Sequence, residues 1–416
     1  MKTHDKAHTL PIADKIEDTP LLLVVDCFCG AGGTTTGFRQ AKINGQQVAK
    51  VIACINHDPK AIKTHSYNHP DAVHYHEDIR TLDLSNLITT VRRWRQKYPK
   101  ALLVLWASLE CTNFSRAKAG KPKNPDSRTL AEHLYRYIDA LQPHYIQIEN
   151  VVEFKSWGPL DDHGRPVDKQ NGRDWLKWRQ HICLRYGYVD SWRELNSANF
   201  GAYTSRNRLF GIFAKRNLPV LFPEITHSKN GRIVDLFTKC QQWKAVREVL
   251  ELDKTGTSIF ERKKPLSEKT LSRIYDGLRR FVQPYHLERT VFLTHYYGKG
   301  FNTSINDPLP TITTKERAAL VVAHHGKCLF EIDSSDTIMI RKIKEFMHAN
   351  GLADLSIRML LVQELLKAQG FPCDYRFAGN SGDQIKFIGN SVVPVVVQYW
   401  AETLALHLRD KPVVAA

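Results

Sequence analysis

The chain has 416 residues, with 59 Lys and Arg against 43 Asp and Glu, and its formal net charge is +16. Its longest apolar runs, such as LLLVV and ALLVLWA, fall far short of the ~18 residues that a membrane helix needs. Residues 1–20 lack the apolar stretch of a signal peptide. We therefore expect a cytoplasmic globular protein without a membrane partner, whose residues 1–20 form a flexible tail.

The positions of the cysteines and of the basic residues indicate which ligands and partners to expect. The eight cysteines are scattered rather than spaced as a disulfide framework, and the close pair Cys27 and Cys29 lacks a zinc-ligand spacing. We expect core thiols there and no metal site. Lys and Arg cluster in residues 116–128 and 254–280, which favours a nucleic-acid partner over a merely solvated basic surface.

Apolar runs and helical patterns alternate along the first half of the chain. The runs predict four buried strands and a short acidic-ended one, and the patterns between them predict helices. The strands are expected at 21–27, 48–56, 73–79, 101–107 and 145–151, with helices after the turn at 30–33, over 60–68 and over 127–141. This alternation is typical of a doubly wound, Rossmann-like α/β domain.

After residue 215 the alternation stops, which predicts a second, smaller domain. We assign the α/β domain to residues 21–215 and 370–410, and the second domain to residues 216–369. Polar residues lie just past apolar runs at Asp26, Asn56, Asp78, Cys111 and Glu149. Ligands of such folds bind at the carboxyl ends of the strands, so these residues mark the expected site.

A set of motifs in chain order resembles the DNA cytosine-5 methyltransferase family. The matching stretches are DCFCGAGGTTTGF, INHDPKA, EDI at 77–79, ECTNFS, DSRTL at 126–130, ENV at 149–151, TSRNRLF at 204–210, RMLLVQELLKAQGFP and GNSVVP. The resemblance covers residues 21–213 and 358–410. The unmatched part is where this family has its target recognition domain.

The resemblance implies the chemistry of the central residues. Carbon 5 of cytosine is a poor nucleophile, so a thiolate must first add to carbon 6, and the resemblance gives that role to Cys111. An acid at ring nitrogen 3 relieves the developing negative charge, which the resemblance gives to Glu149. Arg208 is expected to contact the cytosine carbonyl, and Arg206 to support the Cys and the acid. Two residues apart on one strand, both should point to the same face.

The resemblance also implies S-adenosylmethionine as methyl donor. Phe28 and the glycines are expected around its amino-acid and ribose parts, Asp78 on the adenine amino group and Ile79 against the adenine face. The expected cofactor-binding residues are Asp26, Phe28, Gly30, Gly32, Gly33, Asn56, His57, Asp78, Ile79, Leu130 and Asn390.

Cytosine in a duplex must be flipped out to be methylated, and the basic loop beside Cys111 is suited to closing over the DNA. The expected DNA-binding residues are Ser115, Arg116, Lys118, Lys121, Lys123 and Arg128. We expect a monomer acting on double-stranded DNA, with a companion restriction endonuclease as a further partner.

Several positions depart from the family pattern, and two other functions stay open. Glu110 and Thr112 replace the usual Pro and Gln beside the nucleophile, and Asn56 replaces a Glu that bonds the ribose. A lone Cys at a strand end is more often a core residue than a catalyst. The alternatives are a cytosine-5 methyltransferase acting on RNA such as tRNA, and a catalytically silent DNA-binding homologue.

Overall fold

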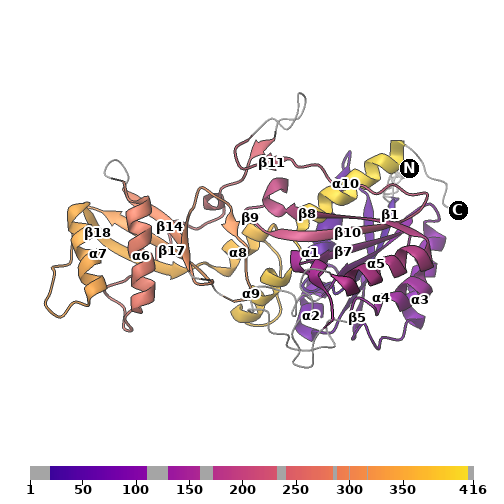
Figure 1. Ribbon diagram of the computed structural model, residues 1–416, viewed down its shortest axis with the longest axis horizontal. Helices are drawn as coiled ribbons and strands as arrows, with labels where there is room; N and C mark the ends of the chain where they lie inside the picture. Colours follow the sequence, from indigo (N-terminus) through magenta and orange to yellow (C-terminus); the bar gives the residue numbers. More distant parts are fainter. Residues whose placement is uncertain are drawn as a thin grey trace, which may run out of the picture.

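A computed structural model of the chain describes residues 19–109, 130–159, 172–231, 240–283, 288–298, 300–315 and 317–410. The molecule is elongated, with a larger lobe built on one sheet and a smaller lobe built on another (Figure 1). No helix within these ranges combines the length and the apolar composition needed to cross a bilayer.

The larger lobe contains a seven-stranded sheet in the order β5-β4-β1-β6-β7-β10-β8. The first five strands in this order run parallel, and β10 runs antiparallel to both β7 and β8. The strands are β1 (Leu22–Cys27), β4 (Ala49–Asn56), β5 (Val73–His76), β6 (Leu102–Ser108), β7 (Tyr145–Asn150), β8 (Tyr188–Asn196) and β10 (Asn207–Lys215). The sequence-based expectation of a doubly wound α/β fold is confirmed.

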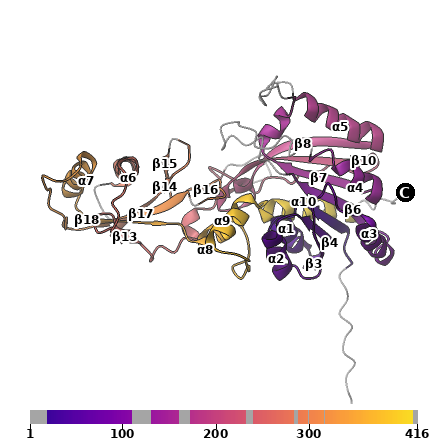
Figure 2. The ribbon, with the colours of Figure 1, turned by 90° about the horizontal axis from the view of Figure 1, so that it is seen from below.

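Helices cover both faces of this sheet. Side chains of α1 and α10 pack on one face, and those of α3, α4 and α5 pack on the other; Figure 2 shows α1 and α5 on opposite sides of the sheet. Asp58 caps α2 by accepting from Lys60 N and Ala61 N, with Pro59 in its first turn. The helices are α1 (Gly33–Gln40), α2 (Pro59–Asn68), α3 (Ser85–Lys97), α4 (Leu134–Leu141), α5 (Arg173–Tyr186) and α10 (Pro394–Asp410).

The smaller lobe contains a five-stranded sheet in the order β13-β18-β17-β14-β15. Ser267 and Thr337 cap its two helices, which pack on one face of the sheet. Its elements are β13 (Thr257–Ser258), α6 (Glu268–Phe281), β14 (Arg289–His295), β15 (Phe301–Ser304), β17 (Ala318–His325), α7 (Ile338–Ala349) and β18 (Leu352–Met359). The other face contacts residues of α8 (Val362–Gln369) and α9 (Ser381–Asn390), which lie between the lobes (Figure 1).

Short strands and helical turns lie in the segments that connect the two lobes. Parallel pairing of β9 (Thr204–Ser205) with β16 (Leu309–Pro310) ties the 309–315 segment to the larger lobe. Leu218 and Phe222 pack into the core of the larger lobe, although the sequence analysis assigned residues after 215 to the second domain. The remaining short elements are β2 (Lys42–Ile43), β3 (Gln46–Gln47), η3 (Val152–Ser156), η4 (Ser197–Phe200), β11 (His227–Ser228), β12 (Gln241–Gln242) and η5 (Val246–Glu248).

Candidate active site

A buried carboxyl group occupies the centre of the candidate active site. Glu149 lies in β7 between Ser108 of β6 and Phe210 of β10, and its residue surface is 6% exposed. The Nε atom of Arg208 lies 3.4 Å from Glu149 Oε1. Pairing of β7 with β10 therefore places an acidic and a cationic side chain together at the carboxyl end of β7.

Two opposing effects act on the pKa of Glu149. Burial raises this pKa above its ordinary value, because the charged carboxylate loses its hydration. The positive charges of Arg208 and Arg206 act in the opposite direction and lower it, but burial is the larger effect. Glu149 thus retains a proton more readily than an exposed glutamate does, which suits a group that donates hydrogen to a substrate.

Arg206 reaches this site from a break between strands. The sequence analysis placed Arg206 and Arg208 on one strand, but that is wrong, because Arg206 lies between β9 and β10. Its backbone N–H donates to Ser197 Oγ at 3.0 Å, and its Nη1 donates to the carbonyl of Ile312 at 3.3 Å. The side chain is buried. Arg206 therefore joins Ser197 to the 309–315 segment, and its positive charge acts on Glu149.

The chain that leads to Cys111 starts beside Glu149. Asn150 Nδ2 donates to the carbonyl of Leu109 at 3.4 Å, just after β6 ends. The predicted nucleophile, its altered neighbours and the predicted DNA-binding residues lie outside the described residues. They are Glu110, Cys111, Thr112, Ser115, Arg116, Lys118, Lys121, Lys123 and Arg128.

The glycines in the turn after β1 have two different roles. A Cβ atom at Gly32 would lie 2.4 Å from the Tyr375 hydroxyl, and one at Gly33 would lie 2.3 Å from the Val392 carbonyl oxygen. These glycines allow close packing of the C-terminal segment. At Gly30, by contrast, the nearest described atom to such a Cβ is the carbonyl oxygen of Phe28, 4.0 Å away. The turn is therefore open to a ligand at Gly30.

Phe28 adds a strained position to the same turn. Its φ angle is +60°, a left-handed conformation that is uncommon for a bulky residue. The side chain is partly buried against the core on the α3–α5 face of the sheet. Strain of this kind is retained where the surrounding structure fixes it and is frequent at ligand sites. Phe28 and Gly30 together fit a site that holds an extended ligand against backbone.

The ends of the neighbouring strands supply polar groups. Asn56 Oδ1 accepts from Asp58 N at 2.9 Å, and His57 is exposed. Hydrogen bonds from Arg80 lower the pKa of Asp78 to about 2, so its carboxylate is ionised at neutral pH. Ile79 and Leu130 are buried. Asn390 is exposed at the end of α9.

Asp26 differs from the other predicted cofactor-binding residues. The sequence analysis placed it just past an apolar run, but it lies inside β1 and is fully buried. Its Oδ2 accepts from Thr35 Oγ1 of α1 at 2.9 Å. Burial raises the pKa of Asp26 to about 7. This carboxyl group faces the underside of α1 rather than the open end of the strand.

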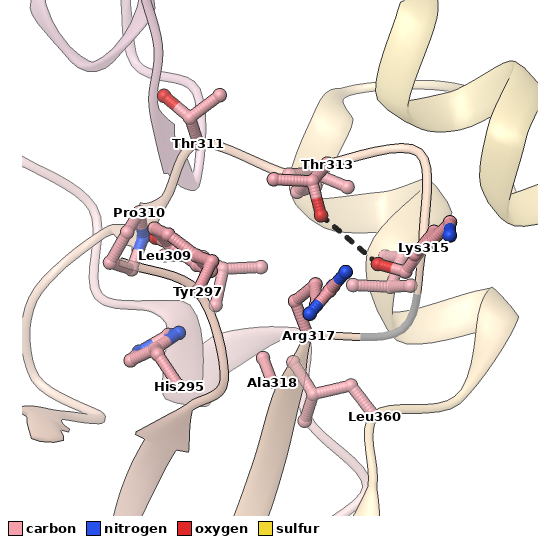
Figure 3. Close-up of a pocket in the computed structure, with 12 residues that line it drawn as sticks. His295, Tyr297, Leu309, Pro310, Thr311, Thr313, Lys315, Arg317, Ala318 and Leu360 are labelled. Carbon is pink, nitrogen blue, oxygen red and sulfur yellow. Dashed lines mark hydrogen bonds between the residues drawn. The ribbon is translucent and has the colours of Figure 1, made fainter. Parts of the chain in front are cut away.

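A pocket lies between the 309–315 segment and the ends of β14 and β17 (Figure 3). Its empty volume is about 350 Å³, part of it open to solvent. His295, Tyr297, Lys315 and Arg317 line it, and Arg206 bonds to Ile312, another lining residue. The sequence analysis did not single out these residues, because they lie in a part of the chain without matching motifs. One hydrogen bond, from Arg206 to Ile312, therefore connects the lining of this pocket to the larger lobe.

Comparisons with known proteins agree with this geometry. Residues 22–405 match the family model described as C-5 cytosine-specific DNA methylase. The chain is 31% identical over 450 residues to the type II methyltransferase M.AgeI of Thalassovita gelatinovora, covering 92% of this chain and 99% of that one. It is 23% identical over 385 residues to the type II methyltransferase M1.HphI of Haemophilus parahaemolyticus, covering 92% and 86%.

A solved structure shares the fold. The crystal structure of S. pombe Dnmt2 methyltransferase superimposes with a TM-score of 0.53 at 15% identity, covering 95% of this chain and 100% of that one. At this identity the likeness shows the fold alone. Because the family model spans nearly the whole chain, the protein belongs to the C-5 cytosine-specific DNA methylase family and is a DNA cytosine-5 methyltransferase.

Proposed function

We propose that this enzyme transfers a methyl group from S-adenosylmethionine to carbon 5 of a cytosine flipped out of a specific duplex DNA sequence. Cys111 is the nucleophile, Glu149 the acid at ring nitrogen 3, and Arg206 and Arg208 the cationic groups around them. The observation that carries the proposal is the buried Glu149 carboxyl, with Arg208 at 3.4 Å and a raised pKa.

In the proposed reaction, Cys111 and Glu149 act in successive steps. The Cys111 thiolate adds to carbon 6, and Glu149 gives its proton to ring nitrogen 3, so the ring becomes an enamine that is nucleophilic at carbon 5. S-adenosylmethionine supplies an electrophilic methyl group to that carbon. A base then removes the proton from carbon 5, the Cys111 sulfur leaves carbon 6 with the electron pair of its bond, and Glu149 regains a proton from ring nitrogen 3.

The groups around Gly30 fit S-adenosylmethionine. Gly30 leaves space for a ligand beside the backbone, and Asp78 presents an ionised carboxylate that can accept from an adenine amino group. Asn56 offers a neutral acceptor and donor for ribose hydroxyls, although its Oδ1 already accepts from Asp58 N. Phe28 and Ile79 supply apolar surface.

The pocket of the smaller lobe supports a DNA substrate. Lys315 and Arg317 lie on its lining with Tyr297, and basic groups next to an aromatic side chain suit a nucleic-acid backbone and its bases. Since the relatives M.AgeI and M1.HphI are named type II methyltransferases, we propose that the methylation serves restriction–modification or epigenetic marking. Bisulfite sequencing of DNA from cells that express the chain would reveal the methylated sequence.

A mechanism-based trap tests the catalytic assignments. A DNA duplex with fluorine at carbon 5 of the target cytosine cannot lose a proton after methyl transfer, so the enzyme should remain covalently bound to it. Cys111→Ser should abolish this adduct, because a hydroxyl is far less ionised than a thiol at neutral pH. Glu149→Gln should slow adduct formation by about 10²- to 10⁴-fold, the usual contribution of a general acid.

Two comparisons make the trap decisive. Duplex binding by Cys111→Ser, measured by gel shift, should stay near the wild-type level, which separates lost chemistry from lost folding. The same fluorinated cytosine in an RNA hairpin should give much less adduct than in DNA. An adduct that persists in Cys111→Ser would remove Cys111 from the reaction, and faster trapping by the RNA would favour an RNA methyltransferase.

A further inference from the structure

A cluster of polar side chains is buried beneath α1, away from the catalytic residues. It consists of Asp26 in β1, Thr35 in α1, Cys54 in β4, His65 in α2 and His74 in β5, here called the α1 polar cluster. All of them except the half-buried His74 are at most 3% exposed. Burying this many polar groups is costly unless each has a partner, so the cluster requires an explanation.

Three members of the cluster have the donor atoms of a metal site. One donor atom each from Cys54, His65 and His74 lies within 4.8 Å of the other two. His65 Nδ1 and His74 Nε2 are 2.9 Å apart. Around a tetrahedral zinc ion, such donors lie roughly 3.3 to 3.6 Å from one another, given Zn–N and Zn–S bonds of about 2.0 and 2.3 Å. The distances among the three donor atoms, 2.9 Å for one pair and at most 4.8 Å for the others, bracket that spacing.

The other two members orient His65. Thr35 Oγ1 donates its one proton to Asp26 Oδ2 at 2.9 Å, so it must accept from His65 Nε2, which lies 3.0 Å away. In a neutral imidazole this leaves a lone pair on Nδ1, the atom that faces His74. Metal-binding histidines typically have such a hydrogen bond on the second ring nitrogen, leading to a carboxylate.

The charges of the cluster fit a divalent cation. Histidine binds a metal ion as neutral imidazole and cysteine binds it as thiolate. The cluster also holds the Asp26 carboxyl group, which is negative when ionised. One divalent ion would balance both negative charges and keep the thiol deprotonated.

We propose that Cys54, His65 and His74 bind one zinc ion, with Thr35 and Asp26 hydrogen-bonded behind His65 and a water in the fourth position. The ion would join β4, α2 and β5, and through Thr35 it would hold α1, the helix that follows the glycine-rich turn. The sequence analysis expected no metal because the close pair Cys27 and Cys29 lacks a zinc-ligand spacing, and it did not consider Cys54, His65 and His74 together. The inference goes beyond methyl transfer and does not depend on it.

Metal content and cobalt spectroscopy test the proposal. The purified full-length protein should contain about one zinc per chain by mass spectrometry. After removal of the zinc, Co²⁺ should restore binding and give the thiolate-to-cobalt charge-transfer absorption that a Cys54 ligand produces. His74→Ala and Cys54→Ser should lose the zinc and this absorption, and a chelator should lower the Tm of the wild type but not that of His74→Ala.

Matched variants control for indirect effects. His76→Ala changes another histidine of β5, and Cys240→Ser changes another buried cysteine; both should keep the zinc and the cobalt spectrum. If a ligand variant fails to fold, the wild-type measurements still decide. A folded wild type with far less than one zinc per chain and no charge-transfer band with Co²⁺ would overturn the proposal, leaving the His65–His74 contact as an ordinary hydrogen bond.

Discussion

Two opposing effects act on the pKa of the Glu149 carboxyl. Because burial raises its pKa while Arg208 and Arg206 lower it, the group can hold a proton and still release it. We expect the rate of adduct formation to rise with pH as Cys111 ionises and to fall again as Glu149 loses its proton. The falling limb reports the pKa of Glu149 where that pKa lies above the pKa of Cys111.

Arg208→Met should shift that falling limb to higher pH. Removing the nearer positive charge makes the Glu149 carboxylate less stable, so the pKa rises and the protonated form persists further into the alkaline range. Single-turnover rates with the fluorinated duplex, measured from acidic to alkaline pH at saturating DNA, would show the shift. An unchanged limb in a variant that still binds DNA would mean that another group gives the alkaline pKa.

Asp78 and Asn56 allow a second test at the scale of single residues. Asp78→Ala should weaken S-adenosylmethionine binding by about 10-fold or more, because a charged acceptor contributes roughly 1.5 to 3 kcal/mol per hydrogen bond. Asn56→Ala should weaken it only a few-fold, since its amide is neutral. Calorimetric titration gives both affinities, with Tm as a control for folding. The reverse order would show that the two strand ends have been assigned to the wrong parts of the cofactor.

Single residues also show what the sequence could and could not predict. Because Glu149 comes at the polar end of an apolar run, it was expected at the carboxyl end of a strand, and the structure places it there. The partners of Arg206 and of Asp26 could not be predicted, because Ile312 and Thr35 meet them only through the tertiary fold. For the same reason the α1 polar cluster has no sequence pattern.

At the scale of elements, continuous apolar runs were the reliable signal. They predicted β1, β4, β6 and β7, whose residues are buried on both faces of the sheet. By contrast, β8 was not singled out, because this edge strand has only two buried residues, at positions 188 and 195, and so no continuous apolar run. The contact of Tyr375 with Gly32 joins segments more than 300 residues apart, and no local pattern records it.

The packing of α1 on α10 gives a prediction for these elements. A Cβ at Gly37 would lie 2.4 Å from the Pro394 carbonyl oxygen and 2.6 Å from Val397 Cβ. Gly37→Ala should therefore destabilise the protein by about 1 to 3 kcal/mol through overpacking, even though Ala favours helices by about 1 kcal/mol. Urea unfolding followed by circular dichroism measures the change.

A glycine in another helix provides the control. Gly382 lies in the first turn of α9, where a Cβ would approach Asn380 Oδ1 only to 3.3 Å. Gly382→Ala should destabilise the protein far less than Gly37→Ala, because a shift of a few tenths of an ångström relieves its one close contact. Equal destabilisation by both substitutions would mean that the loss at Gly37 reflects something other than contact with α10.

At the scale of the whole molecule, the smaller lobe extends away from the sheet that holds the catalytic residues (Figure 1). Its basic and aromatic pocket residues meet the larger lobe through the 309–315 segment. This arrangement separates the surface proposed to select DNA from the sheet that holds Glu149 and Arg208. It also shows that residues 218–222 belong structurally with the catalytic lobe, since they pack into its core.

Exchange of the smaller lobe should therefore change the DNA sequence that is methylated and leave cofactor binding intact. The exchanged part should be residues 257–359 from a relative, with residues 309–315 of this chain retained because Ile312 accepts from Arg206 and β16 pairs with β9. Bisulfite sequencing of DNA methylated by the chimera should reveal the sites of the donor enzyme, and calorimetry should give an unchanged affinity for S-adenosylmethionine. A second chimera that also exchanges residues 218–222 should be less stable, because those side chains fill the core of the larger lobe. If the first chimera methylates the original sites, base recognition must lie in the larger lobe, and the basic loop beside Cys111 becomes the place to look for it.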